Sequence, residues 1–169
     1  LSAINLGANR KFPKDAIRAA VEGAGFTDVE TYINTGNVRL GTTMRSLPRI
    51  EARLEEAFLA DRGFEVPTIV YGAREFAGIG ADVDDLGHDG LERHYVYLLR
   101  DPLRPEVARV VEGPSRDDRR AVVRGRAVHV LVEGAVSAGV VDVLRVEKHL
   151  GLVTVRTANV VRTLAQKWC

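Results

Sequence analysis

The chain has 169 residues, of which 46% are hydrophobic and 28% charged, and its formal net charge is +1. This composition predicts one folded domain, or two small domains packed together, with enough apolar side chains for a sizeable core. Charge, Gly or Pro interrupts every hydrophobic stretch, so we expect no membrane-spanning helix and no membrane partner. The one cysteine, Cys169, excludes an internal disulfide, and we expect a cytoplasmic protein. Because the chain opens on Leu1 rather than Met, we also expect a few leading residues to be absent.

The first half of the chain, residues 1–77, reads as strand, helix, strand, strand, helix, strand. The two middle strands are joined by Asn34-Thr35-Gly36-Asn37, which is typical of a tight hairpin. This order is that of a split βαβ unit with a hairpin. The expected elements are a strand over residues 1–5, a helix over 14–24, strands over 29–33 and 38–40, a helix over 47–58 and a strand over 64–71.

The second half, residues 92–169, repeats this order without repeating the sequence. We expect an α+β protein of two ferredoxin-like βαββαβ halves plus a C-terminal helix. Gly and Asp interrupt the periodicity over residues 78–91, which we predict to be a linker. The expected elements are a strand over residues 95–99, a helix over 107–111, a hairpin over 121–132 that turns at Gly125-Arg126, a helix over 140–150, a strand over 153–155 and a helix over 160–168.

The candidate ligand site lies where two strands of the first half end. Ile4-Asn5-Leu6-Gly7 and Ile33-Asn34-Thr35-Gly36 are near-matching junctions on either side of one helical crossover, so both asparagines should emerge at one edge of a sheet. The loop after the first junction leads into a helix, whose N-terminal N–H groups favour phosphate or carboxylate. The predicted ligand-binding residues here are Asn5, Arg10, Lys11, Asn34 and Asn37. The alternative is that the asparagines only stabilise turns and that the two cations are solvated.

An Arg-rich stretch in the second half allows a different interpretation. Nine arginines lie between Arg93 and Arg126, near Tyr95 and Tyr97, and arginines with stacking aromatics are typical of single-stranded nucleic-acid binding. Acidic residues alternate with these arginines, and the RNA-recognition signature is missing, so a mixed-charge solvated face is the alternative.

Catalytic and metal-binding patterns are weak throughout the chain. The four histidines lack metal-ligand spacing, and His129 falls in a strand that needs only one polar face. We therefore predict no metal site and no cofactor, and we identify no catalytic residue. Asp82, Asp84 and Asp85 in the expected linker would either bind a cation or keep a loop soluble.

Several motifs resemble the bacterial domain-of-unknown-function family 1697. They are Ile4-Asn5-Leu6-Gly7 with Lys11-Phe12-Pro13, the block Thr31-Tyr32-Ile33-Asn34-Thr35-Gly36-Asn37-Val38, and Glu147-Lys148-His149-Leu150-Gly151 followed by Thr154-Val155-Arg156. The resemblance covers nearly the whole chain. It implies two ferredoxin-like halves and implies no particular activity.

The chain also departs from this family pattern at two places. Ser2-Ala3 stands where the family usually has Arg-Gly, which removes a cation from the candidate edge. Near the C-terminus the family favours Thr-Arg-Asn-Trp-Asn-Thr, whereas this chain has Val155-Arg156-Thr157-Ala158-Asn159-Val160. Arg156 and Asn159 are retained, whereas the Trp and one Asn are lost. We include the retained Arg156 among the candidate ligand-binding residues.

Three functions follow from the sequence, in this order. The first is a non-catalytic binding module for an anionic or phosphate-bearing small molecule. The second is a nucleic-acid-binding protein that uses the Arg-rich face and a cleft between the halves. The third is an enzyme of unknown reaction. Exposed sheet edges would allow either a monomer or a weak homodimer.

Overall fold

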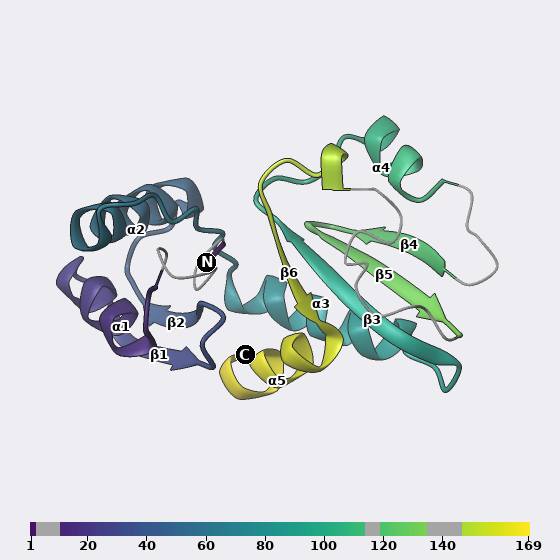
Figure 1. The fold of residues 1–169 in the computed structure, drawn as a ribbon, viewed down its shortest axis with the longest axis horizontal. Helices are drawn as coiled ribbons and strands as arrows, with labels where there is room; N and C mark the ends of the chain where they lie inside the picture. Colours follow the sequence, from purple (N-terminus) through teal and green to yellow (C-terminus); the bar gives the residue numbers. More distant parts are fainter. Residues whose placement is uncertain (3–10, 114–118, 135–146) are drawn as a thin grey trace. The chain divides into compact units, whose positions relative to one another are not determined.

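The computed structural model describes residues 1–2, 11–113, 119–134 and 147–169. These residues form a mixed α+β fold with five α-helices, one 3₁₀ helix and six strands in two antiparallel sheets (Figure 1). Contacts divide the chain into two compact units, residues 1–71 and 72–169, which we describe separately. No helix among the described residues combines the length and the apolar character that crossing a membrane requires.

The first unit contains two helices and a two-stranded sheet. Helix α1 (Lys14–Gly23) begins directly after Pro13, whose fixed φ suits the entry to a helix. Strand β1 (Thr27–Tyr32) pairs antiparallel with β2 (Asn37–Gly41). The expected hairpin is therefore confirmed, although Ile33 lies in the turn with a φ of 48° instead of ending the strand. Helix α2 (Leu47–Arg62) ends at Gly63, whose left-handed φ of 71° is costly for residues with a Cβ.

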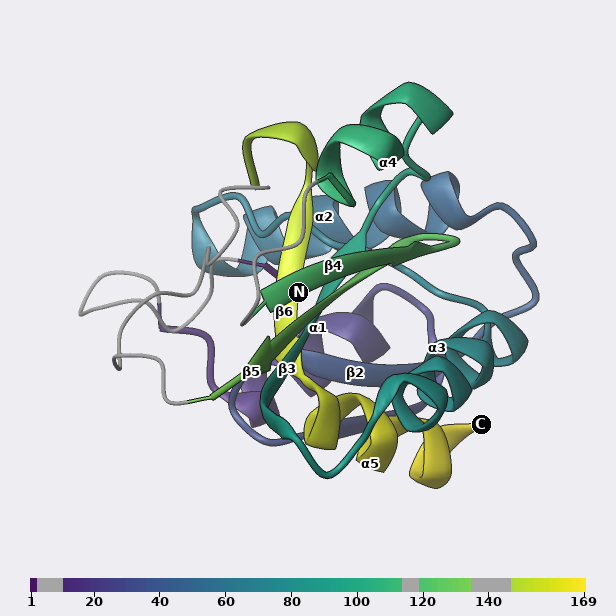
Figure 2. The ribbon, with the colours of Figure 1, turned by 90° about the vertical axis from the view of Figure 1, so that its right-hand side faces the viewer.

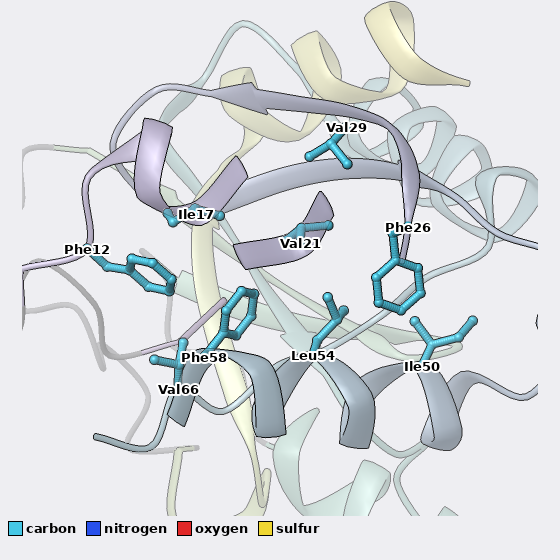
Figure 3. Close-up of a cluster of buried hydrophobic side chains, with 9 residues drawn as sticks. All are labelled: Phe12, Ile17, Val21, Phe26, Val29, Ile50, Leu54, Phe58 and Val66. Atoms are coloured by element: carbon cyan, nitrogen blue, oxygen red, sulfur yellow. The ribbon is translucent and has the colours of Figure 1, made fainter. Parts of the chain in front are cut away.

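The core of the first unit forms between the two helices, β1 and the segments that precede α1 and β1 and follow α2 (Figure 3). The rings of Phe12 and Phe58 meet edge to face with centroids 5.2 Å apart. The apolar spacing that predicted both helices is the spacing of their buried faces. The buried members are Phe12, Ile17, Val21, Phe26, Val29, Ile50, Leu54, Phe58 and Val66.

Residues 64–71 form no strand, contrary to the prediction. Their backbone donors bond instead to side chains of α2, because Thr68 N donates to Glu55 Oε1 and Val70 N donates to Glu51 Oε1, each over 2.8 Å. Pro67 has no N–H to offer a ladder. The expected first strand over residues 1–5 falls mostly outside the described residues.

The second unit is built on a four-stranded sheet with the order β4-β5-β3-β6, in which all neighbours are antiparallel. The β4–β5 turn falls at Gly125 as predicted, with a φ of 56°. The expected helix over 140–150 lies largely outside the described residues. The elements are α3 (Ala73–Leu86), β3 (Leu91–Leu99), α4 (Pro105–Val111), β4 (Arg119–Arg124), β5 (Ala127–Glu133), the 3₁₀ helix η1 (Glu147–His149), β6 (Val153–Thr157) and α5 (Ala158–Trp168).

Helices cover both faces of this sheet (Figures 1 and 2). One face packs Tyr97, Leu99 and Val130 into a cluster with Val111 of α4. Because side chains alternate along a strand, His94, Val96 and Leu98 of β3 point to the opposite face, on which α3 and α5 lie. This alternation places His94 on the same face as the two helices.

Helix α3 replaces most of the linker that we expected over residues 78–91. Ile79, Val83 and Leu86 recur at helical spacing and are buried, so the segment has an apolar face to pack. We predicted a linker because glycines usually disfavour helix. In this helix Gly80 instead permits a close approach to α5. A Cβ added to Gly80 would lie 2.5 Å from the Cβ of Ala165.

Candidate functional site

The residues predicted to bind a ligand do not form a described cluster. Asn5 and Arg10 lie outside the described residues, and Lys11 is exposed just before α1. Asn34 is exposed in the β1–β2 turn. Asn37 is only 8% exposed, and its Nδ2 donates to Tyr32 O over 3.3 Å and to Thr35 Oγ1 over 2.9 Å. The Asn37 side chain therefore stabilises the turn, as the alternative interpretation holds.

Arg156 belongs to the second unit, on β6. Its Nη1 donates to Thr154 Oγ1 over 2.8 Å and to Val155 O over 2.7 Å. Burial lowers the pKa of this guanidinium to about 10, because a low-dielectric surrounding disfavours its charge. At neutral pH the guanidinium is still protonated.

The second unit contains an open groove of about 650 Å³ beside the first half of β3. Its wall comes from the end of α3, the turn between α3 and β3, and the junction of β6 with α5. This junction, residues 155–160, is the segment where the family pattern Thr-Arg-Asn-Trp-Asn-Thr falls. The retained Asn159 lines the groove, and so does Ala158 at the position of the family Trp.

Arg162 provides a positioned cation in this groove. Its Nε donates to Asp84 Oδ1 over 2.7 Å, and its Nη1 donates to Asn159 Oδ1 over 2.9 Å. Two bonds from different helices fix the plane of the guanidinium, while Nη2 bonds to no residue that the structure describes. Arg93 lies in the same groove and donates from Nη1 to Tyr95 Oη over 3.4 Å.

Helix α5 begins at the wall of the groove. Thr157 occupies the cap position without a side-chain bond to the helix, so it leaves the first-turn N–H groups for other acceptors. The helix is 11 residues long, and its N-terminus carries about half a positive charge. Two exposed carboxylates, Asp89 and Glu92, also line the groove, so the charge of its wall is mixed.

Two histidines form a hydrogen-bonded pair at the bottom of this region. His94, on β3, lines the groove, and its Nε2 lies 3.0 Å from Nδ1 of His129 on β5. Burial, the neighbouring His129 and Arg162 lower the pKa of His94 to about 4. Burial also lowers the pKa of His129 to about 4, with Asp82 opposing the shift and Arg124 adding to it. Both rings are neutral at pH 7.

Sequence reasoning missed this pair. We placed His129 in a strand that needs one polar face, but its side chain is fully buried. The β3–β5 register pairs Val96 with His129, which makes His94 and His129 diagonal neighbours on one face. The available signal was a lone His within the apolar run of residues 127–132. No cluster of three or more metal-ligating side chains forms within the described parts of the chain.

The acidic group expected to occupy a loop lies on α3 and forms ion pairs. Arg124 bonds Asp82 over 2.7 Å and Asp85 over 2.8 Å, and these bonds raise the pKa of Arg124. Asp84 holds Arg162, as described above. These carboxylates therefore position arginines rather than solubilising a linker.

A further arginine of the Arg-rich stretch is also engaged. Both Nε and Nη2 of Arg126 bond the carboxylate of Glu75 on α3 over 2.8 Å, and Nη1 donates to Arg100 O over the same distance. Such a bidentate ion pair fixes the relative orientation of the two side chains in addition to its charge attraction. Together with Arg124, Arg126 connects the β4–β5 hairpin to α3, which supports the mixed-charge interpretation for these two residues.

Comparisons with known proteins agree with this fold. One solved structure, described as a conserved bacterial protein, SP0830, from Streptococcus pneumoniae, is similar with a TM-score of 0.74. That similarity covers 97% of this chain and 92% of the other at 22% sequence identity, so it supports the fold alone. None of the curated proteins matches this chain. The family described as "Protein of unknown function (DUF1697)" matches residues 1–129. The chain therefore belongs to this family, as the sequence motifs indicated.

Proposed function

We propose that the protein is a non-catalytic binding module for an anionic or phosphate-bearing small molecule, held in the groove of the second unit. The observation that carries the proposal is the Arg162 guanidinium, which is fixed by Asp84 and Asn159 beside the uncapped N-terminus of α5. Two independent sources of positive potential, a guanidinium and a helix end, meet in one groove.

Preorganisation strengthens this argument. A solvated arginine must lose side-chain freedom when it binds a ligand, whereas Arg162 already has two bonded nitrogen atoms. Bonds between a guanidinium and an anionic oxygen are roughly twice as strong as neutral ones. The mixed charge of the wall favours a ligand with one compact anionic group over a polyanion, because Asp84, Asp89 and Glu92 would repel further negative charge.

The sequence-predicted edge of the first unit is the second candidate location for the same ligand. Lys11 and Asn34 are exposed and therefore accessible there. Asn37 is occupied by its turn, so its substitution would affect binding only through the turn conformation. Arg156, the remaining predicted residue, belongs to β6 of the second unit and is described separately.

Thermal unfolding in phosphate-free buffer tests the proposal. The panel contains inorganic phosphate, nucleotides, sugar phosphates and short RNA and DNA oligomers, at low and moderate salt. A ligand at about 100 times its Kd adds about 2.7 kcal/mol, which raises the Tm by several degrees. We expect a small anion to raise the Tm of the wild-type chain.

Three variants locate the site. Arg162→Gln should abolish the shift, and Arg109→Gln, an exposed arginine on α4, should preserve it. Loss of the shift in Lys11→Ala or Asn34→Ala would place the ligand at the first unit instead. If only RNA or DNA oligomers raise the Tm, and only at low salt, the nucleic-acid-binding alternative would replace the proposal. The absence of any shift would contradict both.

We also propose that the second unit is a ferredoxin-like βαββαβ half, with α5 appended to it. The first unit lacks the fourth strand of this pattern, because residues 64–71 form no strand. The support is the order β4-β5-β3-β6, in which the first and third strands of the unit are central. A crystal structure without a second helix between β5 and β6 would contradict this proposal. The cytoplasm stays the expected compartment, and cell fractionation would test it.

A further inference from the structure

We infer that His94 presents an Nδ1–H donor to the groove, that His129 fixes this tautomer, and that the ligand atom meeting His94 is therefore a hydrogen-bond acceptor such as an anionic oxygen. The ligand part of this inference rests on the proposed function, whereas the tautomer is a property of the free protein. His94 would be a ligand-binding residue and His129 a positioning residue.

The geometry of the pair limits the tautomers to two. His94 Nε2 and His129 Nδ1 lie 3.0 Å apart, with the ring planes tilted by 55°. In a neutral pair one of these nitrogens carries the proton and donates a hydrogen bond, and the other nitrogen accepts that hydrogen bond. If His129 donates, the remaining proton of His94 is on Nδ1; if His94 donates, its Nδ1 is a bare acceptor.

The other nitrogen of His129 decides between them. His129 is fully buried, and its Nε2 has no hydrogen-bond partner among the described residues. If His129 accepted through Nδ1, its Nε2 would carry a buried N–H with no acceptor, and orphaned buried donors are rarer in proteins than under-satisfied acceptors. The favoured arrangement has the proton of His129 on Nδ1, pointing at His94, and a bare lone pair on Nε2.

Burial keeps both rings neutral, with help from nearby cations, so the tautomer determines whether His94 offers the groove a donor or an acceptor. Arg162 of α5 opposes protonation of His94, and Arg124 of β4 opposes protonation of His129. Asp82 of α3 favours a proton on His129 but is itself bonded to Arg124 over 2.7 Å. Burial outweighs the effect of Asp82, and the pKa of each ring is about 4.

The consequence is a second donor in the same groove as Arg162. His94 is less buried than His129, and the hydrogen bond of the pair occupies its Nε2, so Nδ1 is the ring nitrogen that would meet a ligand. A neutral N–H beside a guanidinium suits an oxyanion, which accepts from both. A ligand that offered a donor at this place would leave two donors facing each other, and the groove would discriminate against it.

The test is the tautomer of each histidine in the full chain, measured by long-range ¹H–¹⁵N NMR at about pH 7. We expect both His94 and His129 to carry the proton on Nδ1. A proton on Nε2 of His94 would overturn the inference, whatever the protein binds. His94→Gln and His129→Asn assign the two sets of resonances.

Two substitutions of His129 separate positioning from folding. His129→Asn keeps an N–H donor near the place of Nδ1, so His94 should keep its Nδ1–H. His129→Leu removes the donor, and His94 should then populate the Nε2–H form. Unchanged His94 resonances in a folded His129→Leu protein would overturn the positioning role; if this variant does not fold, the wild-type tautomer alone decides.

Inorganic phosphate then tests the contact with the ligand. Its addition should shift the His94 Nδ1 resonance, and His94→Phe should weaken phosphate binding about tenfold, the loss expected for one hydrogen bond to an anion. His149→Gln, at an exposed histidine of η1, should bind as the wild type does. If the tautomers are as inferred and phosphate causes no shift, the proposed function fails while the assignment of the donor stands.

Discussion

At the scale of single residues, buried polar groups determine which hydrogen bonds this protein makes with a ligand and how its stability depends on pH. His129 is fully buried, and His94 depends on it for a hydrogen bond. Asn37 is nearly buried at the start of β2 and stabilises a turn. Each of these groups leads to a stability prediction that differs from the behaviour of an exposed residue of the same type.

The histidine pair should make the protein less stable in acid. The pKa of His129 falls from an ordinary 6.5 to about 4 on folding, so between these values the unfolded chain binds more protons than the folded one. Its contribution to the free energy of unfolding is complete above pH 6.5 and is lost as the pH falls towards about 4. The expected loss from His129 alone between pH 7 and about 4.5 is on the order of 2 kcal/mol.

Urea unfolding at several pH values measures this loss, and His129→Asn removes one of the two titrating rings, because His94 still titrates. We expect a smaller decrease in the stability of this variant towards acid than in the wild type. His149→Gln is the matched control and should follow the wild-type slope, because His149 is exposed. Equal slopes for the wild type and His129→Asn would contradict the neutral buried ring.

Asn37→Ala should destabilise the first unit by about 1–2 kcal/mol. The substitution leaves Tyr32 O and Thr35 Oγ1 without the Nδ2 donor at a position that is 8% exposed. Thr43→Ala, at an exposed residue after β2, is the control and should change the stability by less than about 0.5 kcal/mol. Equal unfolding midpoints for the two variants would show that the turn does not need this side chain.

At the scale of elements, α3 shows why local sequence signals were insufficient. Gly78, Gly80 and three aspartates read as breakers, yet the segment is helical because tertiary packing and ion pairs outweigh propensity. Gly80 is required for the approach to α5, while Gly78 has open space around its Cα. The two glycines of one helix therefore predict opposite effects of the same substitution.

Gly80→Ala should destabilise the second unit by about 1–3 kcal/mol, because the added methyl group would lie 2.5 Å from the Cβ of Ala165. Gly78→Ala adds a methyl group with nothing within 4 Å and should stabilise α3 by about 0.5–1 kcal/mol. Thermal unfolding of both variants gives the comparison. Stabilisation by Gly80→Ala would contradict the close packing of α3 against α5.

Glu51→Ala tests how residues 64–71 are held. Glu51 is 5% exposed, and its Oε1 accepts the bond from Val70 N, so its loss should destabilise the first unit by about 2 kcal/mol. Hydrogen exchange at the Val70 amide should also accelerate. Glu56→Ala, an exposed residue of the same helix, should affect neither quantity. Unchanged exchange at Val70 would indicate that another group protects the segment.

The periodic elements could be predicted from the sequence and the candidate site could not. The faces of α1 and α2, both described hairpins and α5 follow from apolar spacing and turn glycines such as Gly125. The His94–His129 pair depends on the register between β3 and β5, and Arg162 meets Asp84 across 78 residues of sequence. No local pattern encodes such distant pairs, which is why the candidate groove was missed.

At the scale of the whole molecule, the family and the similar structure support the fold and leave the activity to the chemistry of the site. The net charge of +1 gives no general attraction for polyanions, so selectivity must come from local groups. The groove supplies such groups within the second unit alone. Binding should therefore depend only moderately on salt, unlike binding to nucleic acid.

The most direct test of the central claim is an NMR titration of the full chain with inorganic phosphate, followed through its backbone amides. We expect the largest shifts at Ala158, Asn159 and Val160, in the first turn of α5, and we expect Arg162→Gln to abolish them and Arg109→Gln to preserve them. Shifts that centre on other residues, or that survive Arg162→Gln, would contradict it.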